Sequence, residues 1–215
     1  DGYGASGAYE NGQVRHSVRP SLNLDFANSS TLDHRVSFER GSIATHYDKS
    51  GILRYVNENT PRFDYDPTTG EPRGLLIEES RTNEFQNGEN FDLTYWAASA
   101  DSDLLRYRYA AIAPDGTMSA TKLVGAGAGG ATARKMITTI PGYGSGNQIF
   151  SIYAKAAEYE WIVIACINGS NSAGFGIRIN INTGAVNDNS SHSITPTVTS
   201  EVVGNGWRRI NVHFN

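Results

Sequence analysis

The residues best suited to chemistry by type and spacing are five carboxylates in one short stretch, Asp64, Asp66, Glu71, Glu78 and Glu79. A glycosidase needs two carboxylates on opposite sides of a cleft, one of them with a raised pKa. Asp64 and Asp66 belong to an expected turn, where water keeps both carboxylates ionised. Nearby cations that could pair with them are Arg62, Arg73 and Arg81. We therefore expect a structural turn with surface ion pairs, and no catalytic residue.

Two other motifs are similar to ligand sites but lack essential parts. Residues 64–71 are similar to a calcium loop, yet the third acidic ligand and a closing glutamate at the right spacing are absent. Residues 125–130 match GxGxxG, but the residues that follow predict a strand, whereas a dinucleotide site needs a helix there. The five histidines are scattered, without the short spacing of metal ligands. We expect no cofactor and no metal at these motifs.

The composition excludes several classes of function. The chain has 215 residues, of which 23 are glycine and 39% are hydrophobic, which favours short strands joined by tight turns. A net charge of -4 argues against a nucleic-acid partner, because binding phosphates requires clustered Lys and Arg. No apolar run is long enough to cross a bilayer, so we expect no membrane insertion. The single cysteine, Cys166, lies in an apolar run and is expected in a core, since no histidine is near it in sequence.

Alternating apolar and polar residues predict an all-β chain with three parts. Residues 1–20 lack periodicity and are interpreted as a linker or arm. Residues 21–88 predict a small β-meander, with strands at 21–26, 36–39, 43–46, 52–56 and 75–78. Residues 89–215 predict a jelly-roll β-sandwich, with strands at 104–112, 120–124, 134–140, 148–156, 160–168, 174–182, 198–203 and 207–214. Because an inner strand normally has a neighbour on each side, we expect a sandwich that is truncated at its C-terminus.

The outward-facing side chains of three expected strands, at 148–156, 174–182 and 207–214, supply a candidate binding site. Each strand has one apolar face and an opposite face of aromatic, amide and cationic side chains. Sugars are bound by such surfaces, where a flat ring stacks and planar amide and guanidinium groups donate to vicinal hydroxyls. The alternative is a solvated sandwich face or a contact within a trimer. The candidate glycan-binding residues are Tyr153, Lys155, Arg178, Asn180, Trp207, Arg209, Asn211 and His213.

Two sets of motifs carry a resemblance to known families. Residues 21–45 and 60–83 resemble a leader of phage tail-fibre and head-spike proteins; the stretch from Pro61 to Asn83 is long and fairly specific. Residues 90–96, 113–123 and 206–214 are similar to jelly-roll carbohydrate-binding modules of phage fibres, although these motifs are looser. The resemblance implies a virion component, often trimeric, that faces the host surface. A structural calcium is common in such jelly rolls, so the resemblance leaves a calcium site outside residues 64–71 as an alternative.

The expected function is therefore a component of a virion fibre or spike, on the tail or the head, that binds host-surface glycan without catalysis. Its expected partners are a host polysaccharide, other virion proteins and two further copies in a homotrimer. Two alternatives stay open. The chain could be a purely structural anchor, trimerisation region and spacer, or an auxiliary module of a depolymerase whose catalytic domain lies outside these residues.

Overall fold

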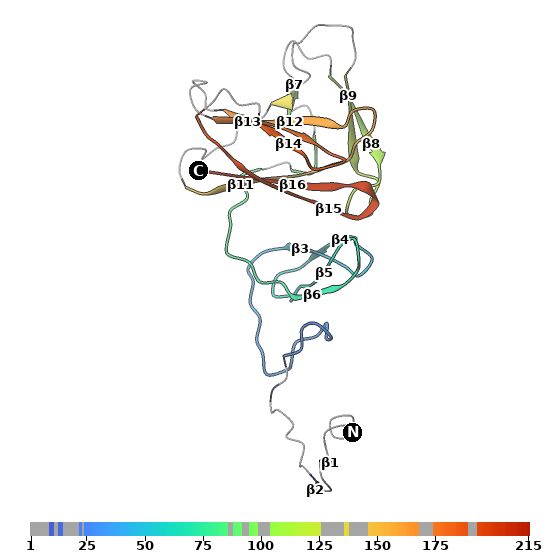
Figure 1. Cartoon of the computed structure of the whole chain (residues 1–215), viewed down its shortest axis with the longest axis vertical. Helices are drawn as coiled ribbons and strands as arrows, with labels where there is room; N and C mark the ends of the chain where they lie inside the picture. Colours follow the sequence, from blue (N-terminus) through green and yellow to red (C-terminus); the bar gives the residue numbers. More distant parts are fainter. Residues whose placement is uncertain are drawn as a thin grey trace.

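The computed structural model describes residues 9–10, 13–14, 22, 24–85, 88–91, 95–98, 104–125, 136–137, 146–167, 174–188 and 193–215. Within these residues the fold is all-β, as predicted, and consists of small antiparallel sheets (Figure 1). The predicted linker contains one short ladder, in which β1 (Tyr9–Glu10) pairs with β2 (Gln13–Val14).

The meander is built from two hairpins. β3 (Ala44–Tyr47) pairs with β4 (Leu53–Val56), and β5 (Phe63–Tyr65) pairs with β6 (Pro72–Leu75). The predicted turn after β3 is present: the Asp48 carboxylate accepts from the backbone N–H groups of Ser50 and Ile52 at 2.8 and 3.0 Å. Gly51 in this turn has φ of 73°, and a Cβ there would collide with the Pro67 carbonyl. Only glycine fits this position.

Several strand predictions in the meander are wrong. Residues 24–26 and 36–39 form no ladder, and the strand expected at 75–78 is instead β6, three residues earlier. β5 was not predicted. Alternation shows that a segment has one apolar face, but a strand also needs a partner for its backbone groups. For residues 24–26 and 36–39 no pairing strand is present in the described part of the chain, and backbone groups of Asp25 and Val36 bond within local turns instead.

The sandwich has two layers, which the ribbon shows stacked above the meander (Figure 1). The proximal sheet, nearer the meander, has the order β11 (Gln148–Ala154), β16 (Arg208–Phe214), β15 (Thr197–Val202). The distal sheet has the order β12 (Trp161–Ile167), β13 (Gly174–Asn180), β14 (Val186–Asp188). This two-layered arrangement is compatible with the predicted jelly roll.

The core lies between the two sheets. The apolar faces of β13 and β16 meet there, and the rings of Phe175 and Phe214 are 4.8 Å apart. The buried cluster consists of Ile164, Phe175, Ile177, Ile179, Ile210 and Val212. By contrast, Tyr47 is the one buried hydrophobic side chain among the described residues of the meander. The meander therefore depends on contacts outside itself.

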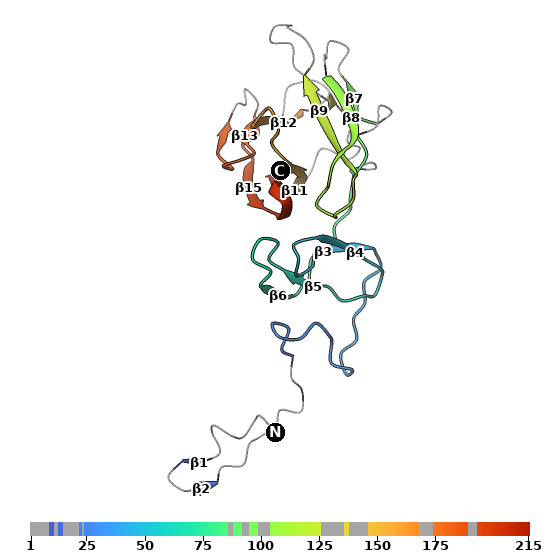
Figure 2. The ribbon, with the colours of Figure 1, turned by 90° about the vertical axis from the view of Figure 1, so that its right-hand side faces the viewer.

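A third hairpin stands beside the two sheets. β8 (Leu104–Ala111) pairs with β9 (Ala120–Gly125) (Figure 2). Its tip touches both other parts, since the Pro114 carbonyl accepts from Leu53 N at 3.0 Å and the Ile112 carbonyl accepts from Trp207 Nε1 at 2.9 Å. A minor ladder joins β7 (Ala97–Ala98) to β10 (Met136–Ile137), which is the described part of the strand expected at 134–140.

The last strand, β16, lies between β11 and β15 and pairs with both of them. The expectation of a truncated sandwich was based on a final strand that lacked a neighbour. In the structure β16 has both neighbours, because β15 turns back through the 3-10 turn Gly204–Gly206 and β11 joins from the other side; the truncation itself stays a prediction. The predicted tight turn at 204–206 is present.

Candidate functional site

The predicted facing of the three strands is confirmed for their apolar sides. Phe150, Ile152 and Ala154 of β11 pack against the core, as do residues of β13 and β16. Six of the eight candidate residues consequently lie on or beside the outer face of the proximal sheet: Tyr153, Lys155, Trp207, Arg209, Asn211 and His213.

Cross-strand rows organise this outer face. Tyr153, Arg209 and Glu201 form one row across β11, β16 and β15, and Asn211 lies in the next row. The Asn211 amide accepts from Ser151 Oγ at 2.7 Å. A shallow hollow of about 230 Å³ beside these rows is lined by Thr199, Ser200, Glu201 and Asn211. The side chains that line this hollow are all polar.

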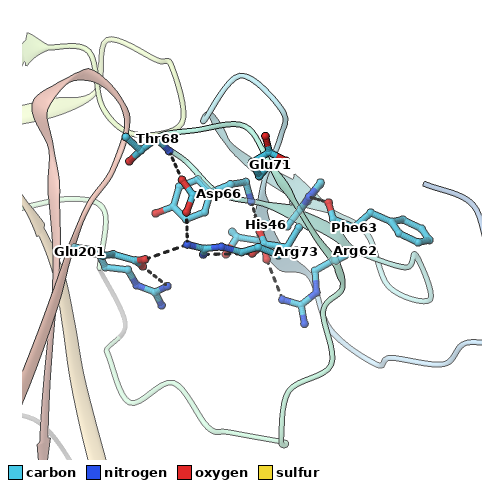
Figure 3. Close-up of polar contacts among 12 residues, drawn as sticks. His46, Arg62, Phe63, Asp66, Thr68, Glu71, Arg73 and Glu201 are labelled. Atoms are coloured by element: carbon cyan, nitrogen blue, oxygen red, sulfur yellow. Dashed lines mark hydrogen bonds and ion pairs between the residues drawn. The ribbon is translucent and has the colours of Figure 1, made fainter. Parts of the chain in front are cut away.

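The meander covers the first row. The hydroxyl oxygens of Tyr47 and Tyr153 are 2.9 Å apart. Arg73 of the meander lies 2.9 Å from Asp66 and 3.8 Å from Glu201 of the sandwich, and Figure 3 shows it reaching between them. Two of the candidate residues, Tyr153 and Arg209, thus belong to a joint between the two units, since Glu201 also lies 3.8 Å from Arg209.

Two more candidates make local contacts on this side of the sandwich. Lys155 Nζ donates to the Asn205 carbonyl at 2.7 Å, and the Trp207 indole donates to the Ile112 carbonyl of the third hairpin at 2.9 Å. These side chains hold the turn before β16 and the tip of the hairpin in place. These contacts are structural, and the contact with the hairpin explains why Trp207 is only partly exposed.

The remaining two candidates lie on the other sheet. Arg178 is exposed on the outer face of the distal sheet, and its guanidinium carbon lies 4.7 Å from the centroid of the Trp161 ring. Asn180 was expected to face outward, which is wrong: its amide is buried and accepts from Asn182 N and Thr183 N at 3.0 and 2.9 Å. Because the core separates the two sheets, the eight residues do not form one surface.

Trp161 was missed as a companion of Arg178. The sequence signal was present. Trp161 lies two residues before Val163 on β12 and therefore points to the same face of the sheet, and Val163 pairs directly with Arg178. Side chains on one face of an antiparallel sheet meet their diagonal neighbours when they are long or aromatic. Finding the pair required the register of two strands that no local pattern supplies.

The carboxylates of the turn have different surroundings. Backbone N–H groups of Thr69 and Thr68 lower the pKa of Asp66 to about 2, so this carboxylate is ionised, as expected for a turn. Asp64 was expected to be solvated, which is wrong, because it is buried and accepts from Tyr47 N at 2.8 Å. Both carboxylates serve the meander's own structure.

The expected ion pairs of the nearby arginines are present. Arg73 pairs with Asp66, Arg62 lies 2.7 Å from Glu78, and Arg81 lies 2.7 Å from Glu79. Arg62 is buried, where a surface pair was expected; its Nη1 also donates to the Thr45 carbonyl at 2.9 Å. The Arg62–Glu78 pair therefore ties the segment after β6 back to the meander.

The cysteine, the candidate metal ligands and the glycine-rich motif are the remaining features from the sequence. Cys166 packs against the sandwich core, and burial raises the pKa of its thiol, which makes it a poor nucleophile. In the described residues no three His, Cys, Asp or Glu side chains come together as a metal site, and no helix there is long and apolar enough to span a membrane. Most of the glycine-rich motif at 125–130 lies outside the described residues.

The tyrosine pair between the two units should show non-additive mutational effects. Burial raises the pKa of the Tyr47 hydroxyl above its ordinary value and the bond to Tyr153 raises it further, so the Tyr47 hydroxyl keeps its proton in this hydrogen bond. Tyr47→Phe and Tyr153→Phe should each lower the free energy of unfolding by about 1 kcal/mol. The double variant should cost no more than one single variant, because neither partner is left unpaired. Urea unfolding measures this; additive losses would mean that the hydroxyls do not bind each other.

Comparison of the sequence with protein-family models and with curated proteins gives no match.

Proposed function

We propose that this chain is a non-catalytic component of a phage fibre or spike, on the tail or the head, that binds glycan on the host surface. Two lines of support are independent of each other. The resemblance of residues 60–83 to phage fibre and spike leaders supports the virion part. The arrangement of side chains on the uncovered surface of the sandwich supports the glycan part.

The observation that carries the glycan part is the Trp161–Arg178 pair. It lies on the distal sheet, on the side of the sandwich opposite the meander, so the joint leaves it open. Across β13 and β14, Arg178 is paired in register with Asn187, whose side chain is also exposed. An indole ring, a guanidinium and an amide on one flat face are the groups that sugar hydroxyls and ring C–H bonds require.

A glycan array probed with the intact chain tests this function. Specific hits are expected, and Arg178→Gln should lower binding about tenfold while the melting temperature stays unchanged, because Arg178 is exposed. Arg54→Gln is a matched control, since this exposed arginine belongs to the meander and pairs with Asp48. Binding by Arg178→Gln equal to that of the control variant would contradict the role of the distal sheet.

A purely structural role is the second candidate, and the joint between meander and sandwich favours it. Tyr47, Thr68 and Arg73 all contact the proximal sheet, and Thr68 Oγ1 donates to the Val202 carbonyl at 3.1 Å. Such a joint suits a rigid spacer or an anchoring and trimerisation region within a fibre. If the chain binds no glycan on the array and is a trimer in light scattering, this structural function is favoured over glycan binding.

A further inference from the structure

The third hairpin contains a strained and solvent-exposed tyrosine. Tyr107 pairs with Lys122 and Ala111 pairs with Ala120, so the residues between them on β8 stand opposite Thr121 alone. Within this bulge Tyr109 has φ of 56°, a region that bulky side chains rarely adopt. Bulges redirect side chains, and strained residues of this kind concentrate at binding sites. The bulge is therefore a candidate site outside the surfaces described above.

The bulge presents two aromatic rings to solvent. Tyr109 is 61% exposed and Tyr107 is 52% exposed. Neither ring belongs to the core of the sandwich. Exposed tyrosines combine a flat apolar face with a hydroxyl that donates and accepts hydrogen bonds, which suits the C–H face and the hydroxyls of a sugar.

Arg108 supplies a cation that lies against the Tyr109 ring and has no acidic partner among the described residues. Its Nη2 donates to the Tyr109 hydroxyl at 3.1 Å, and its guanidinium carbon lies 5.1 Å from the Tyr109 ring centroid. Among the described residues Arg108 makes no ion pair with a carboxylate. The neighbouring Lys122 differs, because its Nζ lies 2.5 Å from Glu158. A guanidinium held against a ring keeps its N–H fork available for a bidentate carboxylate.

We propose that Tyr107, Arg108 and Tyr109 form a second saccharide site, which takes a carboxylate-bearing sugar. This inference rests on the glycan-binding function proposed above. The tyrosine rings stack on the sugar, and Arg108 pairs with its carboxylate. A protein partner fits the site less well, because a stable protein interface buries about 800 Å² on each side, far more than a few side chains on a hairpin bulge offer.

The test uses the intact chain on a glycan array that carries sialylated and uronic-acid glycans beside their neutral counterparts. Hits are expected among the carboxylated glycans. Arg108→Gln should lower their binding about tenfold, because it removes the charge and keeps an amide. Tyr109→Gly should lower binding similarly without reducing the melting temperature, since glycine adopts positive φ without strain. Retained folding in this variant separates loss of the ring from loss of structure.

Matched variants separate this site from the first one. Tyr159→Ala removes a tyrosine that is 60% exposed but lies outside the hairpin, and should bind like the parent chain. A double variant, Arg108→Gln with Arg178→Gln, should bind less than either single variant. If Arg178→Gln weakens binding while Arg108→Gln and Tyr109→Gly do not, this second site is wrong and the proposed function stands. Hits confined to neutral glycans overturn the carboxylate assignment, and an array without hits overturns both proposals.

Discussion

Phe175→Ala should lower the free energy of unfolding by about 3–5 kcal/mol, the usual range for removing a fully buried phenylalanine. Phe175 is completely buried at the centre of the sandwich, and its ring packs against Phe214 across the two sheets. Truncation leaves a cavity that the surrounding strands can fill only in part. Because a domain has only about 5–15 kcal/mol of stability, this single change removes a large share of it. Urea unfolding followed by circular dichroism measures the loss.

Two further variants keep this prediction testable if Phe175→Ala does not fold. Phe175→Leu retains most of the volume and should cost about 1–1.5 kcal/mol. Val163→Ala is the control on the opposite face of the distal sheet, where Val163 is 59% exposed, and should cost less than about 0.5 kcal/mol. Equal losses in Phe175→Ala and Val163→Ala would mean that the core and outer faces are inverted.

Arg208→Met should lower the free energy of unfolding by about 3 kcal/mol, although it replaces a charged residue by an apolar one of similar length. Arg208 is only 7% exposed and reaches from the proximal sheet to the turn after β13. Its guanidinium donates to the carbonyls of Ile181 at 2.6 Å and Asn182 at 2.8 Å, and to Ser200 Oγ at 3.1 Å. Methionine leaves these acceptors without the charged donor that links the two sheets.

The neighbouring arginine is the matched control for this change. Arg209 has the opposite facing on the same strand, and its side chain is partly exposed beside Glu201 at 3.8 Å. Arg209→Met should cost less than about 1 kcal/mol, because exposed ion pairs contribute little. Thermal or urea unfolding of the two variants compares them directly. A smaller loss for Arg208→Met than for Arg209→Met would contradict the bridging role of Arg208.

The facing of residues within a single strand was predictable from sequence. Phe175, Ile177 and Ile179 alternate with polar or small residues, and all three are buried as expected. Alternation is a local property, because successive side chains of a strand point to opposite faces whatever the strand pairs with. The turns at 48–51 and 204–206 were predictable for a similar reason, since their glycines require local backbone conformations.

The location of the binding surface was not predictable in this way. Tyr153 and Arg178 both face away from the core, yet they lie on different sheets and therefore on opposite sides of the sandwich. Tyr153 also meets Tyr47, a residue 106 positions earlier in the chain. No local pattern specifies which sheet a strand joins or what another unit covers, because both depend on contacts between distant segments.

The sequence by itself therefore determined the all-β class, the apolar faces of β11, β13 and β16, and the main turns. Only the tertiary structure decided that Asn180 closes a buried turn, that Arg208 joins the two sheets and that Tyr47 of the meander meets Tyr153. The physical reason is the range of the interactions involved. Backbone alternation and turn chemistry act over a few residues, whereas buried polar partners and covered faces arise only when distant strands pack together.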